Sequence, residues 1–352
     1  MRTILIYINF LVTSDMKKVT IICLSLLLFA CQPSTTEEVN LYSARKEALM
    51  QPLLEAFTKE TGIKVNLISS KADALLTRIQ NEGANSPADV LLTTDAGRLH
   101  RAKTADVFTP IDSKLLISSI PSQYRDQDQY WFGLSVRARP IMVTEAASNL
   151  NLASYQDLAK PELAGKICIR SSGNIYNQSL TASLLENLGE APTENWANNL
   201  VKNFARNPQG GDRDQIRAAA AGQCSVVVAN TYYLANMLAD QSNPKDVEAA
   251  KKIRIIWPNQ SDHGTHVNIS GAGVLKTAPN KSNAVKLIEF LASDKAQKMY
   301  ADVNYEYPVK SGIKLNSVLQ DFGDFKADKL ALNKLGENNA SAVRLMDRAG
   351  WK

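Results

Sequence analysis

Three tyrosines stand where apolar, strand-like runs give way to helix-like ones. Tyr176 follows the segment SSGN, and Tyr232 and Tyr233 follow the run VVVAN. Adjacent side chains point apart on a helix or a strand, so Tyr232 and Tyr233 face one point only at the end of an element. A phenolate is a hard anionic donor, and because a free phenol has a pKa near about 10, only a strong Lewis acid displaces its proton at neutral pH. The three tyrosines therefore predict an Fe(III) site, and packing in a core or at its rim is the alternative.

A second group of residues could hold an anion beside such a cation. Ser172, Gly173 and Asn174 precede a predicted helix, where free backbone N–H groups and the helix dipole favour carbonate or phosphate. Three phenolates neutralise Fe³⁺ but leave octahedral positions for a bidentate anion. The cations that could offset its charge are Arg45, Lys46, Arg137 and Arg139. The alternative is plain N-capping of the helix by Ser172 or Asn174.

The elements that must position these residues alternate between strands and helices. The first part of the chain reads as strand, helix, strand, helix and strand over EEVNLYSAR, KEALMQPLLEAFTKETG, IKVNLISS, KADALLTRIQNEG and ADVLLTT. Gly62 is placed to end the first of these helices. This order predicts a parallel sheet covered by helices, whose ligands bind beyond the carboxyl ends of the strands.

A second lobe repeats the alternation. The segment WFGLSVRARPIMVT predicts a strand that crosses into it, and HVNISGAGVLKTA predicts a strand that returns. The chain of 352 residues suits two lobes. We therefore expect an α/β protein with two similar lobes joined by crossing strands and a cleft between them. The predicted first lobe spans residues 38–135 and 268–312, and the second spans 136–267 and 313–352.

The first 30 residues predict an export signal. From Met16, the predicted start, the chain reads MKKVTIICLSLLLFAC, with two lysines before an apolar run of residues 19–29 that is too short to span a bilayer. Its end, LLFAC, resembles a bacterial lipobox in which Cys31 is lipidated, which would tie an otherwise periplasmic protein to a membrane. The alternative is plain cleavage near Ala30, which would release a soluble periplasmic protein.

The cysteines and charges agree with export. Cys168 and Cys224 remain as an even pair in strand-like runs, which favours a disulfide between neighbouring strands in an oxidising compartment, with two buried thiols as the alternative. The net charge of +5 is spread along the chain without a basic run, so we expect no nucleic-acid partner.

The sequence resembles the bacterial periplasmic ferric-ion-binding proteins, the receptors of iron(III) ABC importers. The motif NTYY with a tyrosine 56 residues upstream carries the resemblance, together with NLYSARKEALMQPLLEAF, SPADVLLTTDAGRL, GLSVRARPIMV and SGNIYNQS. The resemblance implies a bilobal type II periplasmic-binding fold, similar to transferrin lobes, in a monomer that delivers Fe(III) to an ABC permease. It also implies iron ligation by the three tyrosines and an anion site lined by Ser172, Gly173, Asn174 and Asn230.

The first lobe departs from this family pattern. Many relatives place a histidine after the first strand, where this chain has Lys46 and Glu47, and some place a glutamate after the third strand, where it has Thr94 and Asp95. By the same resemblance Tyr42 is the candidate ligand that remains in the first lobe. Its alternative role is that of a core residue of the first strand.

Two other functions compete with an iron receptor. One is a receptor for an organic anion or a polyamine, which would keep the fold and change the cargo. The other is a periplasmic hydrolase, for which Ser171 and Ser172 would be the candidate nucleophiles. No histidine stands in a recognisable arrangement with these serines, so we expect a protein that is not an enzyme.

Overall fold

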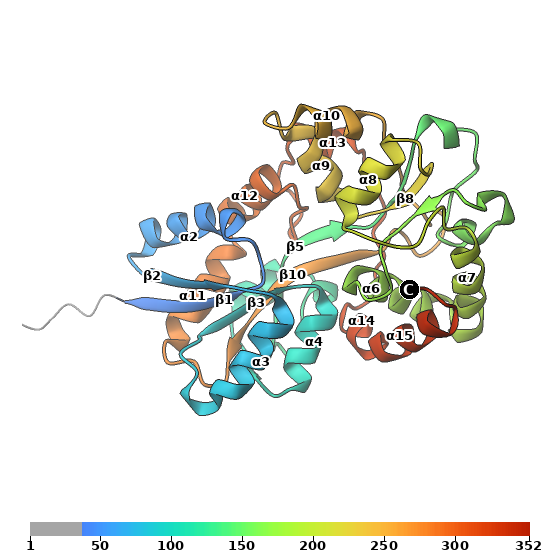
Figure 1. The fold of residues 1–352 in the computed structure, drawn as a ribbon. Coiled ribbons are helices and arrows are strands. Elements are labelled where there is room, and N and C mark those ends of the chain that lie inside the picture. The colour runs from blue at the N-terminus through green and yellow to red at the C-terminus, as the bar shows by residue number, and fades with distance from the viewer. Residues whose placement is uncertain (1–36) are drawn as a thin grey trace, which may run out of the picture. The chain divides into compact units, whose positions relative to one another are not determined.

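Two β-sheets organise residues 37–352, the part of the chain that this computed structural model describes (Figure 1). The predicted leader of residues 1–30 and the predicted lipidation at Cys31 lie outside the described residues. Within residues 37–352, no helix is long and apolar enough to cross a bilayer.

The first sheet contains both parallel and antiparallel strands. Its three N-terminal strands are parallel, and β10 runs antiparallel to them and continues the sheet. In spatial order they are β2 (Lys64–Ser69), β1 (Glu38–Ser43), β3 (Val90–Thr94), β10 (Val267–Leu275) and β4 (Phe108–Thr109), and β5 (Phe132–Ala138) also pairs with β10.

Helices cover this sheet and bury their apolar stripes on it. In α2 (Glu47–Thr61) the stripe is Met50, Leu53, Leu54 and Phe57, at the spacing that the sequence predicts. Gly62 ends the helix with φ of 76°, a conformation that favours glycine. The other helices of this part are α3 (Ala72–Glu82), α4 (Ala96–Thr104), α5 (Lys114–Ser119), α11 (Lys281–Leu291) and α12 (Asp294–Asn304).

The second sheet is smaller and has the order β7 (Ile167–Cys168), β8 (Val226–Val228), β6 (Ile141–Val143) and β9 (Arg254–Ile256). Strands β7 and β8 are parallel, so helices that follow them begin at the same edge. The helices here are α6 (Ile175–Leu188), α7 (Glu190–Lys202), α8 (Asp212–Ala220), α9 (Thr231–Ala239) and α10 (Pro244–Lys251).

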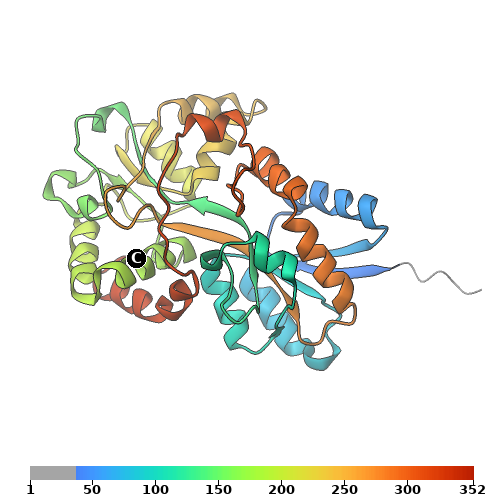
Figure 2. The same cartoon turned by 180° about the vertical axis from the view of Figure 1, so that it is seen from behind.

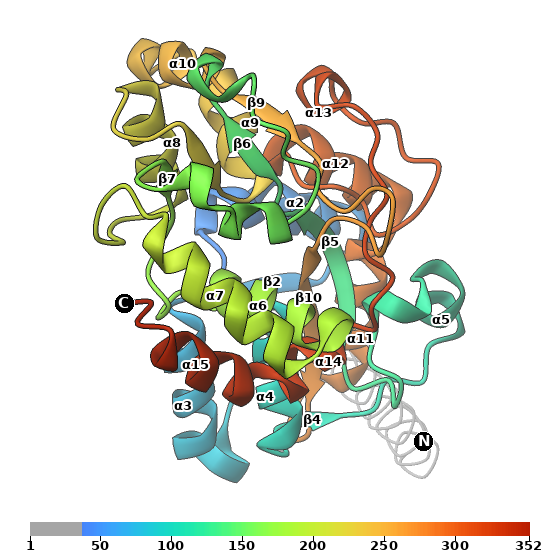
Figure 3. The ribbon, with the colours of Figure 1, turned by 90° about the vertical axis from the view of Figure 1, so that its right-hand side faces the viewer.

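The chain crosses between the sheets where the sequence predicts. Strand β5 belongs to the first sheet and β6 to the second, and β9 and β10 make the return crossing (Figure 2). The last helices follow a further crossing: α13 (Ser317–Asp321), α14 (Asn333–Glu337) and α15 (Asn339–Arg348). Helix α15 lies along α6 (Figure 3), whereas α14 contacts both α6 and α4 of the first lobe. At Gly336 of α14 a Cβ would come within 2.3 Å of His100. The segment that we assigned to the second lobe therefore touches both lobes.

Cys168 and Cys224 form a disulfide in the structure, with an S–S distance of 2.05 Å. The bond lies in a small buried cluster that also contains Ile216 of α8 and Leu234 of α9. It fixes β7, a strand of only two residues, beside the chain that leads into β8. These two segments carry the tyrosines of the candidate site at their far ends.

We expect the double variant Cys168→Ala/Cys224→Ala to lower the free energy of unfolding by about 3 to 4 kcal/mol. The bond closes a loop with a sequence separation of 56, and a loop of this size restricts the unfolded chain by about that amount. Urea denaturation without reductant measures the difference. An unchanged midpoint in the double variant would show that the disulfide does not stabilise the fold.

Candidate metal centre

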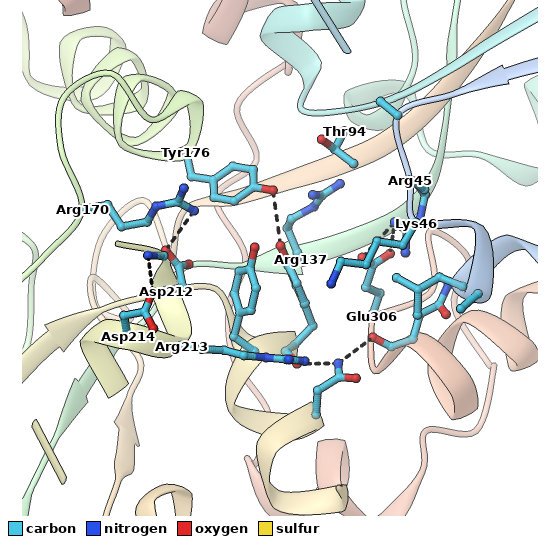
Figure 4. Close-up of a pocket in the computed structure, with 18 of the residues that line it drawn as sticks. Arg45, Lys46, Thr94, Arg137, Arg170, Tyr176, Asp212, Arg213, Asp214 and Glu306 are labelled. Carbon is cyan, nitrogen blue, oxygen red and sulfur yellow. Dashed lines mark hydrogen bonds and ion pairs between the residues drawn. The ribbon is translucent and has the colours of Figure 1, made fainter. Parts of the chain in front are cut away.

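A cavity of about 590 Å³ lies between elements of the two lobes (Figure 4). The N-terminal turn of α2 and the C-terminal end of α12 line it from the first lobe. The first turns of α6, α8 and α9 line it from the second lobe, and Arg137 of the crossing strand β5 lies between them. Three tyrosines, six cationic side chains and three carboxylates reach this space.

The structure brings all three predicted tyrosines to this cavity. Tyr176 is the second residue of α6, and Tyr232 and Tyr233 are the second and third residues of α9. The hydroxyl of Tyr232 donates to the hydroxyl of Tyr176 over 3.3 Å. The rings of Tyr232 and Tyr233 lie 4.2 Å apart between centroids. Because β7 and β8 are parallel neighbours, the helices after them start side by side, and this brings tyrosines 56 residues apart into contact.

The environment of Tyr232 and Tyr233 favours their protonated form. Burial and the neighbouring oxygens of Tyr176 and Tyr233 raise the pKa of Tyr232 well above its ordinary value. Burial, Tyr176 and the carboxylate of Asp212 likewise raise the pKa of Tyr233. These raised pKa values apply to the protein without a bound cation. A multivalent cation among these oxygens would reverse the balance and favour the phenolates.

Three arginines lie close to the tyrosine rings, and one of them, Arg139, is 5.9 Å from the ring centroid of Tyr176. The guanidinium of Arg137 is 5.9 Å from the ring centroids of both Tyr176 and Tyr232, and that of Arg170 is 5.7 Å from the centroid of Tyr176. Arg137 is buried and donates to Ser270 of β10. Arg170 pairs with Asp212 over 3.6 Å. These cations favour negative charge at the tyrosine oxygens.

The predicted anion loop does not line the cavity. The side chain of Asn174 accepts from the backbone N–H of Tyr176 over 3.2 Å, so it caps α6. The carbonyl of Ser172 accepts from Gln178, and Gly173 is exposed. These contacts show the N-capping alternative for Asn174, and the anion role of Ser172, Gly173 and Asn174 stays a prediction.

Asn230 and Arg139 also lie behind the cavity wall. Arg139 donates to Asp212 and to the side chain of Asn230, each over 3.0 Å, and further donates to Asn177. The backbone N–H of Asn230 donates to Asp212 as well. These buried bonds join α6, α8 and the N-cap of α9 beneath the tyrosines. Arg139 and Asn230 thus support the site from below, and their contact with an anion stays a prediction.

Tyr42 does not join the other tyrosines. It is buried on β1, its hydroxyl donates to Glu82 over 3.0 Å, and the guanidinium of Arg78 lies 4.9 Å from its ring centroid. It does not line the cavity. This position favours the core alternative for Tyr42 over a ligand role. Arg45, in contrast, lines the cavity as the sequence predicts.

Several cavity residues were not among the predicted site residues. They are Arg170, Arg213, Arg217, Asp212, Asp214 and Glu306. Arg170 comes two residues after the end of β7, so the strand-end reasoning that finds the tyrosines would also find it. Asp212 and Asp214 lie in the first turn of α8, where the helix dipole favours acidic residues. The sequence alone therefore gives no reason to assign these carboxylates to a binding site.

A buried carboxylate joins the lobes next to the cavity. Asp95, the N-cap of α4, accepts from the hydroxyl of Ser179 over 2.8 Å and from the side-chain amide of Asn268 over 2.8 Å. Ser179 lies one turn after Tyr176 on α6, so this bond ties the helix of one candidate ligand to the first lobe. Asp95 holds φ at 90°, an unusual angle for a residue with a Cβ.

We expect Asp95→Ala to lower the free energy of unfolding by about 3 kcal/mol or more, because it leaves buried donors of Ser179 and Asn268 unpaired and removes the cap of α4. Asp106→Ala is the matched control. Asp106 also has a positive φ, of 57°, but its carboxylate pairs with Lys276 at the surface. Urea denaturation of both variants makes the comparison. Equal losses would show that the bonds of Asp95 contribute no more than a surface pair.

The donor chemistry of the cavity points to the tyrosines. Within residues 37–352, no group of three or more His, Cys, Asp or Glu side chains could hold a metal ion. Three phenol oxygens in one cavity are the donors that suit a small, highly charged, hard cation.

Two α/β lobes, strands that cross between them and an interlobe cavity define a periplasmic-type solute-binding protein. The family model for bacterial extracellular solute-binding proteins matches residues 85–324, and the chain belongs to this family. It is a binding protein and not an enzyme. The α/β fold with two lobes that the sequence predicts is confirmed.

The chain is similar to several curated and solved proteins. It is 49% identical to iron uptake protein A1 of Synechocystis sp., over 91% of this chain and 89% of the relative. It is 30% identical to the Fe(3+)-binding periplasmic protein of Serratia marcescens, over 96% and 98% of the two chains. A structure of the Trichodesmium protein IdiA (FutA) in complex with iron and citrate ligands is 50% identical, with a TM-score of 0.87 over 90% of this chain and all of that one.

Proposed function

We propose that this chain is an extracytoplasmic receptor that captures Fe(III) through Tyr176, Tyr232 and Tyr233 together with an anion. The observation that carries the proposal is that three tyrosines line one cavity, with the hydroxyls of Tyr176 and Tyr232 in hydrogen-bond contact. Relatives whose names state iron uptake or Fe(3+) binding, at up to 49% identity over most of the chain, support it. The lobes would close about the crossing strands on loading.

The charge of the cavity supports an anion as co-ligand. Six cationic and three carboxylate side chains line it, an excess of three positive charges. Fe³⁺ with three phenolates is neutral, so the excess remains after iron enters. Carbonate or phosphate would offset part of it, and the Trichodesmium relative holds citrate. The same excess opposes a polyamine, so the second candidate function is a receptor for an organic anion without iron.

The same proposal includes the location of the receptor, its oligomeric state and its partner. We place the mature protein in the periplasm after removal of residues 1–30, as a monomer, with Cys31 as a candidate lipid anchor. Its partner would be the ABC permease of an iron(III) importer. The Serratia marcescens relative is named as periplasmic, which supports this location.

The test is the colour of the loaded protein. Purified protein without metal is mixed with ferric nitrilotriacetate, and the visible spectrum is recorded with and without bicarbonate. We expect an absorption band from charge transfer between tyrosinate and iron, at one iron per chain. Tight iron binding without this band would contradict ligation by the tyrosines, and no iron binding with any anion would favour the second candidate.

A further inference from the structure

The C-terminal segment of the chain has one end in each lobe. Leu335 is buried in the hydrophobic core of the first lobe, whereas Leu345 and Trp351 are buried in that of the second lobe. We call residues 332–351, which include α14 and α15, the C-terminal strap (Figure 3). None of the proposed iron ligands lies on the strap, and the crossing strands β5 and β10 already join the lobes. The strap therefore requires a separate explanation.

The first-lobe end of the strap packs closely on α4. Gly336 of α14 lies so near α4 that a Cβ on this glycine would be 2.3 Å from the Cβ of His100. One turn earlier on α4, a Cβ on Gly97 would be 3.9 Å from the Cα of Gly336. The backbone N–H of Leu332 also donates to the carbonyl of Gln123 in the first lobe, over 3.2 Å. Glycine allows such an approach because it has no side chain, so this contact has no room for an added methyl group.

The other end of the strap is fixed in the second lobe. Nε1 of Trp351 donates to the carbonyl of Arg170 over 3.0 Å, and Nε of Arg348 donates to Glu194 over 2.7 Å. The ring of Trp351 also packs edge to face with the ring of Phe204, with centroids 5.6 Å apart. Arg170 lines the cavity. The strap thus runs from α4 of the first lobe to the chain segment that forms the cavity wall in the second lobe.

In this structure the lobes also meet at the cavity. Nδ2 of Asn236 on α9 donates to the carbonyl of Asn304 at the end of α12 over 3.4 Å, and the hydroxyl of Ser179 on α6 donates to Asp95 over 2.8 Å. The contact between α14 and α4 therefore accompanies the contacts that bring the lobes together. A rotation of the lobes about the crossing strands moves the two ends of the strap relative to each other, because these ends are packed in different lobes. The close contact of α14 with α4 opposes that rotation.

We propose that the C-terminal strap holds the lobes in the arrangement in which they meet at the cavity, so that the contact of α14 with α4 sets how fast bound iron leaves. This inference rests on the proposed function. A ligand that needs one arrangement of the lobes binds more weakly when that arrangement is less populated, so a weakened strap lowers the affinity without a change at the ligands. Gly336 and His100 are then positioning residues, because they act on iron only through the arrangement of the lobes.

The test weakens the contact between α14 and α4 in two ways. Gly336→Ala inserts a methyl group where a Cβ would overlap His100, and His100→Ala removes the imidazole that packs there. Iron release to an excess of chelator is followed as the decay of the tyrosinate band, and small-angle X-ray scattering gives the radius of gyration of the protein without metal. We expect release to be about tenfold faster in Gly336→Ala and about threefold faster in His100→Ala, with a larger radius of gyration in both. The wavelength of the tyrosinate band should not change, because the iron ligands are the same.

Gly273→Ala is the matched control, since it crowds a glycine within the first lobe alone. A Cβ at Gly273 of β10 would be 2.6 Å from the carbonyl oxygen of Tyr130 and 2.7 Å from the ring of Phe108. We expect this variant to unfold at a lower urea concentration than the wild type. Its rate of iron release and its radius of gyration should match those of the wild type.

The outcomes separate the role of the strap from the proposed function. Iron release at the wild-type rate in His100→Ala, or an equal acceleration in Gly273→Ala, would overturn the role of the strap while iron binding by the tyrosines stands. Absence of the tyrosinate band from the wild-type protein with every anion would instead contradict the proposed function.

Discussion

Replacing Tyr232 with Phe should lower the Fe(III) affinity by more than about 100-fold, because substitutions outside the first coordination shell already cost about 10-fold to 100-fold. Tyr232 is the central tyrosine: it donates to Tyr176 and lies against the ring of Tyr233. The variant keeps the ring and removes one anionic oxygen. It also leaves Fe³⁺ with one uncompensated charge beside Arg137.

Tyr42→Phe provides the matched control for this prediction. It removes the same atom from a buried tyrosine, but Tyr42 bonds to Glu82 away from the cavity. We expect unchanged iron affinity and a loss of about 1 kcal/mol of stability from the broken hydrogen bond. Competition of each protein with a chelator, followed at the tyrosinate band, gives both affinities. Equal affinities in Tyr232→Phe and wild type would remove Tyr232 from the ligands, and a large loss in Tyr42→Phe would add Tyr42 to them.

The sequence predicts the tyrosine cluster because its causes are local. A strand end followed by a helix start can be read from periodicity, and parallel order then brings Tyr176 and Tyr232 to one edge. The sequence does not show toward which face of the first sheet the side chain of Tyr42 points. Both faces of β1 are covered, so residues 41–43 are all buried and no alternation of polar and apolar residues marks the side that looks toward the cavity.

The anion residues could not be assigned from the sequence for a different physical reason. The backbone N–H groups of a loop before a helix can bind an anion or a capping side chain of the same loop. The sequence of residues 172–174 does not show which of these acceptors the N–H groups bind. In the structure Asn174 occupies the first-turn N–H of α6. The contact between Asp95 and Ser179 joins residues 84 positions apart, and only the packing of the two lobes creates it. Such long-range polar pairs leave no local pattern.

Iron affinity should rise steeply with pH, since each tyrosine must lose a proton to bind. The pKa values of Tyr232 and Tyr233 are raised above that of free tyrosine, so both phenols are protonated in the empty protein at neutral pH. Below these pKa values every phenolate formed on binding releases one proton, and the logarithm of the affinity rises by about one per pH unit for each tyrosine. Three ligating tyrosines therefore predict a slope of about three, after correction for the protonation of the competing chelator. Titrations between about pH 6 and 8 measure it.

The Tyr233→Phe variant makes this slope diagnostic. If Tyr233 is a ligand, its removal lowers the slope by about one proton as well as the affinity, because one ionising group is lost from the binding reaction. If Tyr233 only supports Tyr232 by contact of their rings, the affinity falls but the slope stays the same. Asp212→Asn tests the cause of the raised pKa, since this carboxylate is one of the groups that raise the pKa of both tyrosines. Removing its charge makes the phenols easier to ionise, which favours iron binding, but it also removes a negative charge that attracts the cation, which weakens iron binding. The number of tyrosines that ionise stays the same, so the slope is unchanged. A slope that remains near three in Tyr233→Phe would assign the third proton to the anion and not to this tyrosine.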